Sequence, residues 1–81
     1  MPRFYFDARA DHVFIEDDEG VELPDLTAVE REALEVVANI GRDKIRTGSC
    51  AVTIEVRTED RRRVLAATVS LHVERDESRP H

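Results

Sequence analysis

The sequence predicts an α+β fold, a two-layer ββαββ arrangement with one antiparallel sheet and one long helix packed on one face. Apolar and polar residues alternate over 3–10, 51–57 and 63–74, which is the period of a half-buried strand. Over 26–45 the apolar residues instead recur at steps of three and four, which is the period of an amphipathic helix. Because one helix can cover only one face of a small sheet, these segments form two layers.

Length and charge limit the classes of function. The 81 residues suffice for one domain, which we place at 1–75 and follow with a charged tail at 76–81. The formal charge of −6 argues against nucleic-acid binding, which depends on neutralising phosphates. There is no apolar run of the roughly 20 residues that cross a bilayer, and no signal peptide is recognisable. We therefore expect a cytoplasmic protein that does not bind membranes.

The first strands form a hairpin in this interpretation. Aromatic side chains at positions 4 and 6 face one way and Tyr5 faces the other, while Asp11 and His12 provide the turn. The segment 13–15 is then a second, short strand that ends in an acidic stretch. Gly20 closes that stretch, where we expect a positive φ.

Two residues compete to cap the long helix. Asp25 can accept a hydrogen bond from the first turn, and Thr27 begins a Thr-x-x-Glu capping box. We favour Asp25. The apolar stripe continues past Gly41, which costs up to about 1 kcal/mol relative to alanine inside a helix. Gly48 is the predicted residue just beyond the helix end.

The pattern also assigns the residues to the two faces of the sheet. The predicted core comprises Phe4, Phe6, Ile15, Leu26, Val29, Ala33, Val36, Val37, Ile40, Val52, Ile54, Val56, Leu65, Val69 and Leu71. The face away from the helix, called the open face below, is predicted to hold Tyr5, Phe14, Val64, Ala66, Thr68 and Ser70. A contiguous exposed patch of apolar and weakly polar residues usually marks an interface, so we expect homodimerisation through this face or through an edge strand.

Three parts of the sequence carry a family resemblance: the Pro-Arg-aromatic opening at 1–7, the Asp-Glu-Gly-Val-Glu-Leu-Pro-Asp-Leu segment at 18–26, and Glu-Ala-Leu at 32–34. On these residues the chain resembles a family of short bacterial proteins catalogued as a domain of unknown function. The resemblance covers nearly the whole chain and implies no known activity. The chain departs from the family pattern at the turn 59–62, which lacks the glycine expected there, and in its last strand, which is more charged towards its end.

A looser similarity links the acidic-Gly turn and the Pro-Asp-Leu segment to antitoxin domains of HicB type. Proteins of that type bind a small basic toxin, and they often carry a DNA-binding domain for which this chain has no room. The similarity implies a basic protein partner held by the acidic turn. An antitoxin-like regulator is therefore the alternative to a self-associating module.

No motif for catalysis, cofactor or metal is recognisable. Cys50 is the one cysteine and is interpreted as a small buried residue, and His12, His72 and His81 are too dispersed for a metal site. The acidic cluster lacks the spacing of a calcium-binding loop, which favours a solvated turn. Its members are Asp7, Glu16, Asp17, Asp18, Glu19, Glu22 and Asp25. We therefore expect neither an enzyme nor a cofactor site.

Arginines gather at the second turn. Arg57, Arg61, Arg62 and Arg63 could bind phosphate or an acidic partner, or could simply form a charge-balanced, soluble tip. We predict a small interaction module that self-associates. The predicted interaction surface consists of Tyr5, Phe14 and Thr68 on the open face and Arg61, Arg62 and Arg63 at the turn.

Overall fold

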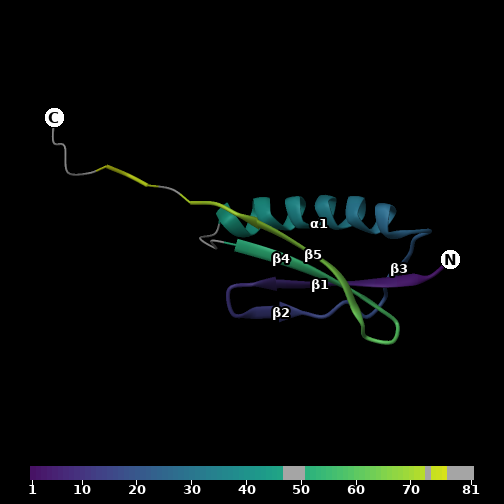
Figure 1. Cartoon of the computed structure of the whole chain (residues 1–81). Helices are drawn as coiled ribbons and strands as arrows, with labels where there is room; N and C mark the ends of the chain where they lie inside the picture. The colour runs from purple at the N-terminus through teal and green to yellow at the C-terminus, as the bar shows by residue number, and fades with distance from the viewer. Residues whose placement is uncertain (47–50, 73, 77–81) are drawn as a thin grey trace.

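A computed structural model describes residues 1–46, 51–72 and 74–76, apart from the side chain of residue 45. The described chain forms β1 (Arg3–Ala10), β2 (Val13–Ile15), β3 (Val21–Glu22), α1 (Leu26–Arg46), β4 (Ala51–Thr58) and β5 (Arg63–Ser70). One antiparallel sheet carries one long helix on one face, as Figure 1 shows. The predicted α+β fold class is confirmed.

The strand order across the sheet is β2-β1-β4-β5, and β3 pairs with β1 on the same side as β2. The first hairpin is confirmed, because Ala10 lies opposite Val13 and the two residues between them make the turn. The first of these, Asp11, has a φ of 55°. The central strands β1 and β4 are far apart in the sequence, with Phe4 opposite Thr58.

Asp25 caps the helix. Its Oδ1 accepts a hydrogen bond of 2.9 Å from the backbone N–H of Ala28, the third residue of α1. Thr27 lies inside the first turn of the helix. Of the two predicted caps, the structure therefore selects Asp25, and the helix begins at Leu26 as that choice requires.

The helix continues through Gly41 to Arg46, as the stripe predicts. A Cβ atom on Gly41 would lie only 2.5 Å from Cγ1 of Val69, so the missing side chain lets α1 approach β5 closely. Two predictions fall outside the described residues: the role of Gly48 beyond the helix end and the burial of Cys50.

The core lies between α1 and the sheet. The buried apolar residues are Phe4, Ala10, Val29, Ala33, Val37, Val52, Ile54 and Val56. Five further predicted members are partly buried against this cluster, namely Phe6, Val36, Ile40, Leu65 and Val69. Among the described residues, the prediction is wrong for Ile15, Leu26 and Leu71, which are all more than half exposed.

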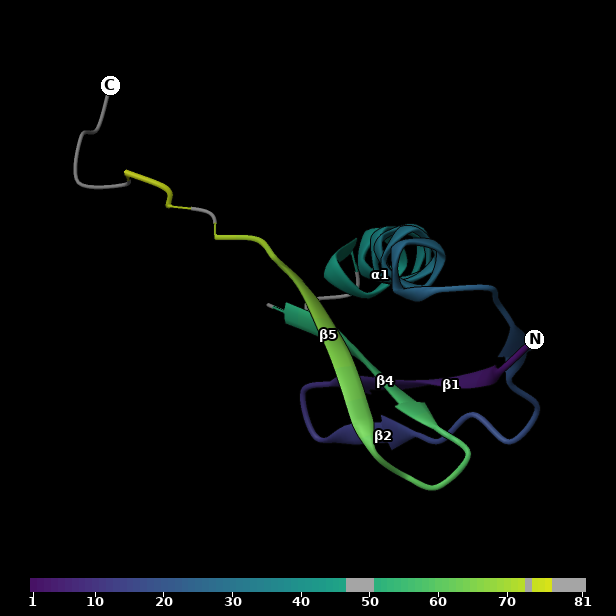
Figure 2. The same ribbon diagram turned by 45° about the vertical axis from the view of Figure 1, so that its right-hand side comes forward.

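The position of α1 explains these errors. The helix packs on β4 and β5, touches β1 only slightly, and makes no contact with β2 in the described chain. In Figures 1 and 2, β2 is accordingly the strand farthest from α1. Ile15 is therefore on the helix side of the sheet but beyond the reach of the helix. Leu26 begins α1, and Leu71 follows the last residue of β5.

Strand β5 differs from its prediction at both ends. It stops at Ser70 and does not continue to position 74. At its start, the register with β4 shifts: Leu65 lies opposite Val56, but Arg63 lies opposite Arg57. The extra residue is Val64, which packs against the core instead of joining the open face as predicted.

Candidate interaction surfaces

The outer edge of β1 is closed along most of its length. β2 pairs with its last three residues and β3 with its first two. Between them, the backbone N–H of Phe6 donates a 3.0 Å hydrogen bond to Oδ2 of Asp17. The other oxygen, Oδ1, accepts from the N–H groups of Glu19 at 3.1 Å and Gly20 at 3.2 Å. A side-chain carboxylate thus fills the gap between two short strands.

These contacts also set the charge state of the carboxylate. Burial by itself would raise the pKa of Asp17, but the amides of Phe6, Glu19 and Gly20 and the charge of Arg57 together hold that pKa below its ordinary value. The positive φ predicted for Gly20 is confirmed at 73°. The turn therefore depends on an ionised carboxylate and a left-handed glycine.

Arg57 connects β4 to this turn. Its Nε donates a 2.8 Å hydrogen bond to Oδ2 of Asp7, whose residue is only 5% exposed, and this bond raises the pKa of the arginine. Its Nη2 donates to the carbonyl oxygen of Asp17 at 2.9 Å and lies 3.4 Å from Oε2 of Glu16. Asp7 in turn accepts the N–H of Asp17 through Oδ1 at 2.9 Å. The carboxylates of Asp7, Glu16 and Asp17 are thus hydrogen-bonded or ion-paired to groups within the fold.

The acidic residues do not otherwise converge. Within the described ranges, no three histidine, cysteine, aspartate or glutamate side chains are grouped in a way that could hold a metal ion. The described residues also form no pocket. In the described chain, the surfaces left for binding are the open face, the part of the other face that α1 does not cover, the outer side of α1 and the free edge of the sheet.

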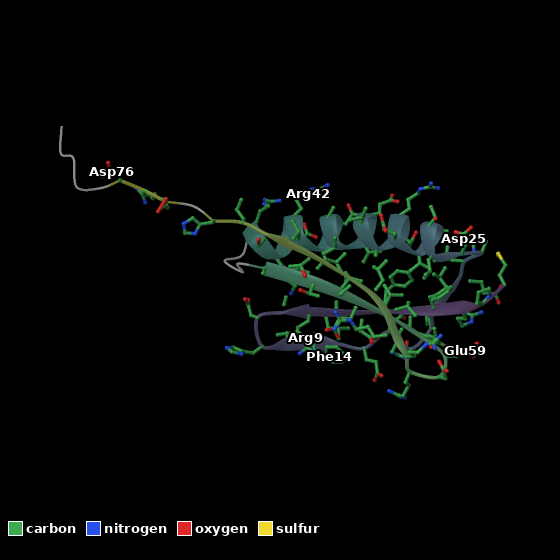
Figure 3. All side chains as sticks on the ribbon, viewed as in Figure 1. Arg9, Phe14, Asp25, Arg42, Glu59 and Asp76 are labelled. Atoms are coloured by element: carbon green, nitrogen blue, oxygen red, sulfur yellow. The ribbon has the colours of Figure 1, made fainter. Side chains whose placement is uncertain are left out.

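The predicted aromatic residues lie on the open face, but arginines cover them. The guanidinium of Arg57 lies 4.6 Å from the ring centre of Tyr5, and that of Arg9 lies 4.7 Å from the ring centre of Phe14. Figure 3 shows Arg9 beside Phe14 on the neighbouring strand. The rings are therefore parts of stacked, charged pairs and do not form an apolar patch.

Thr68 is far from both rings across the sheet. In the register, Phe14, Arg9, Thr53 and Thr68 form one row, with Phe14 on β2 and Thr68 on β5 at its two ends. The hydroxyl oxygen of Thr68 lies 2.8 Å from that of Thr53. The structure thus places the three predicted open-face residues on one face without bringing them together.

The predicted arginine patch is divided. Arg57 points to Asp7, whereas Arg61, Arg62 and Arg63 lie at or next to the β4–β5 turn. Arg61 forms an ion pair with Glu16 at 3.4 Å. Its backbone has a φ of 66°, the left-handed conformation for which a glycine was expected in this turn. Arg63 lies 3.8 Å from a carboxylate oxygen of Glu55, and the N–H of Arg62 donates to the Thr58 hydroxyl.

The edge formed by β5 is different in kind. β5 pairs with β4 on one side, and the described chain supplies no strand for its other side. From Val64 to Ser70 this strand carries no charged residue, no proline and no glycine. Natural proteins usually protect such an edge with charges, proline or bulges, because its free N–H and C=O groups can pair with another strand.

A second exposed feature was missed by the sequence analysis. Val13 and Ile15 on β2 and Val21 on β3 lie opposite residues of β1 that face the helix side of the sheet. All three are exposed, at 52%, 58% and 38%. Alternation along 13–15 correctly suggests two faces, but it cannot reveal that the helix fails to cover one of them.

In the described residues, no helix has the length and apolar character needed to cross a membrane. Searches of the curated proteins and of the solved structures give no match. A family model described as "Domain of unknown function (DUF6894)" matches residues 3–70, which include every strand and the helix. It agrees with the resemblance carried by the opening and by the segment around Pro24; the similarity to HicB-type antitoxins receives no such match. The chain belongs to the DUF6894 family of domains of unknown function.

Proposed function

We propose that this chain is a self-associating interaction module in which the β5 edges of two copies pair in antiparallel orientation. The observation that carries the proposal is the edge of β5, which beyond the register shift at Val64 has no charge, proline or glycine from Leu65 to Ser70. The opposite side of the sheet ends in strands of three and two residues with a carboxylate bridging them. Among the described strands, β5 is therefore the one that offers a long ladder of backbone groups to a partner strand.

A second copy suits this edge because the strand is compatible with itself. Residues directly opposite each other in an antiparallel pair point to the same face, so a two-fold axis at Ala67 sets Leu65 of one copy opposite Val69 of the other. Both residues lie on the helix side and are partly buried in the single chain. Pairing with a second copy would bury these two side chains further.

Antiparallel pairing also keeps like charges at the start of the strand apart. With the two-fold axis at Ala67, Arg63 of one copy lies beside Leu71 of the other and Arg62 beside His72, whereas a parallel pair in register sets each arginine beside its own copy. Like charges directly opposite each other destabilise a strand pair, so the antiparallel arrangement is preferred over the parallel one.

The open face is the weaker candidate for self-association. Its two aromatic rings are covered by Arg9 and Arg57, and Glu55 lies 3.8 Å from both Arg9 and Arg63. Burying such a face against a second copy would require desolvating these charges, which costs more than covering neutral side chains. Pairing at the β5 edge does not require these charged groups to be desolvated.

The test is one substitution at the edge. In Ala66→Lys the new ammonium lies opposite Glu55 within the monomer, where a cross-strand ion pair supports the fold. In the β5–β5 pair, the same change brings two like charges close together. Sedimentation equilibrium over a range of concentrations should show a wild-type dimer and a variant whose dimer dissociation constant is at least about tenfold weaker.

Ala38→Lys is the matched control, because it makes the same change at an exposed position of α1. It should dimerise as the wild type does. A wild-type protein that stays monomeric at high concentration would overturn the proposal. So would an Ala66→Lys variant that dimerises normally while its thermal unfolding shows an intact fold.

A further inference from the structure

We infer that residues 11–22 form a strap that opens as one unit, with Asp17 as its point of attachment, while the rest of the domain stays folded. The strap contains β2, the acidic turn and β3, and it covers the outer edge of β1. When the strap opens, this edge of β1 is free to pair with another strand. The strap lies on the side of the sheet away from β5, so the inference does not depend on the dimer proposed above.

The strap contributes little to the core of the domain. Its residues are all exposed except Asp17 and Gly20, which are partly buried. In the described chain, α1 makes no contact with β2 or β3. Figure 2 shows β2 on the side of the sheet away from α1. A segment with few buried apolar contacts opens at a lower free energy than the core, so this segment should open first.

The two ends of the strap adjoin residues that are held by the core. Ala10, the last residue of β1, is buried and lies opposite Val52 of β4. At the other end, Leu23 packs against the core, and its N–H donates a 3.1 Å hydrogen bond to the carbonyl oxygen of Pro2. Because both flanking residues are fixed independently of the strap, the opening unit begins at residue 11 and ends at residue 22.

Three hydrogen bonds between the strap and the central strands meet at Asp17. Its carboxylate accepts the N–H of Phe6 at 3.0 Å, and its own N–H donates to the carboxylate of Asp7 at 2.9 Å. Its carbonyl oxygen accepts a bond from Nη2 of Arg57 at 2.9 Å. Arg57 and Asp7 are joined to each other at 2.8 Å. One residue of the strap is therefore attached to an ion pair that the sheet itself provides.

Two other ion pairs of the strap lie in solvent. Glu22 is 3.1 Å from Arg3 and Glu16 is 3.4 Å from Arg61, and all four side chains are more than a third exposed. Exposed ion pairs contribute little to stability because water screens them. Without Asp17, the strap therefore depends mainly on backbone pairing by strands of three and two residues. Since Asp17 lies between these strands, its release frees both together.

Amide hydrogen exchange, followed residue by residue by NMR, can test this opening. Successive N–H groups of a strand point to alternate edges, so the N–H groups of Phe4 and Ala8 lie on the same edge as that of Phe6. These two outer amides lie opposite β3 and β2, respectively. The inner amides, those of Tyr5 and Asp7, point toward β4.

The wild type at pH 7 gives the first comparison. If the strap opens as one unit, the two outer amides exchange through the same opening and should have similar protection factors. The inner amides exchange only when β1 separates from β4. The protection factors of the outer amides should therefore be at least about tenfold below those of the inner amides.

The variant Asp17→Ala removes the attachment and should lower the protection of both outer amides by at least about tenfold. The inner amides should be unchanged. The N–H bound by Asp17 is that of Phe6, so a change at both outer amides reports movement of the strap and not the loss of one bond. Asp18→Ala is the matched control, because it removes a carboxylate at the exposed neighbouring position. It should leave all four amides as in the wild type.

Four outcomes would overturn the inference. In the wild type, the outer amides could be as protected as the inner ones. In Asp17→Ala, the outer amides could be unchanged, the two could respond differently from each other, or outer and inner amides could lose protection equally because the whole domain opens. The wild-type comparison requires no substitution, so it decides the matter even if Asp17→Ala does not fold.

Discussion

At the scale of single residues, Asp17 and Arg57 hold together segments that are far apart in the sequence. The carboxylate of Asp17 takes the place of a strand along β1, and Arg57 reaches from β4 to the same turn. Each group is charged and satisfied by neighbours within the fold. These residues are therefore structural, although a dense acidic turn beside arginines resembles a binding site when only the sequence is read.

The state of Asp17 predicts how stability depends on pH. Its pKa is lower in the folded protein than in the unfolded chain, so its stabilising effect is complete above the unfolded value of about 4. That effect is lost as pH falls from there through the folded value. Asp17→Asn removes the charge, so the difference in unfolding free energy between wild type and variant should be largest near neutral pH and shrink below about pH 4.

Urea unfolding followed by circular dichroism at pH 7, 5, 4 and 3 measures this difference. Asp18→Asn is the control, since it makes the same charge change at the exposed neighbouring position. A wild-type advantage over Asp17→Asn that stays constant down to pH 3 would contradict the role given to the carboxylate.

At the scale of elements, the start of α1 gives a second prediction. Asp25→Ala removes the acceptor for the Ala28 N–H and should lower the unfolding free energy by about 1 kcal/mol. Thr27→Ala should change it by less than about half as much, because Thr27 lies within the helix. Thermal unfolding of both variants decides between the two caps. A larger loss in Thr27→Ala would favour the capping box.

The contact between α1 and β5 gives a third prediction. Gly41→Ala gains helix propensity, but its Cβ would meet Val69 at 2.5 Å, and overpacking of this kind costs about 1–3 kcal/mol. We expect a net loss of stability. In a Val69→Ala background the conflict disappears, so the same change should be neutral or stabilising.

The four proteins of this double-mutant cycle can be compared by urea unfolding. Additive effects of Gly41→Ala and Val69→Ala would show that the two positions do not meet. The expected result is instead a coupling free energy of at least about 1 kcal/mol.

How far the sequence predicts each element depends on how local its cause is. The Asp25 cap, the positive φ of Gly20 and the alternation in β1 and β4 follow from neighbouring residues, and all three are confirmed. The burial of Ile15 is wrong because it depends on where a distant helix lies across the sheet. The placement of Val64 is wrong because a register shift with β4 changes the face of the strand.

The candidate surfaces were predicted less well than the fold. Tyr5, Phe14 and Thr68 do lie on the open face, but only the structure shows that Arg9 and Arg57 cover the two rings. Cross-strand neighbours depend on register, which alternation alone does not define. An edge strand was expected to be an interface, and β5 is the strand whose composition suits that role.

At the scale of the whole molecule, the single helix α1 covers only part of one face of the sheet, because the strand path is four strands wide. The helix packs mainly on β4 and β5, and the side chains of Val13 and Ile15 on β2 stay exposed on the same face of the sheet. Self-association at the β5 edge, as proposed above, would leave this exposed part of the sheet at the opposite side of the assembly.

The pairing of β1 with β4 also determines when the protein can fold during its synthesis. β1 is made first, yet its central neighbour is made only after α1, because Phe4 pairs with Thr58. Until then the nascent chain has a short hairpin and an amphipathic helix whose main packing surface, β4 and β5, does not exist. Contacts so distant in sequence slow folding and leave apolar surface exposed to aggregation. The domain therefore folds as a unit only once nearly all of it has left the ribosome.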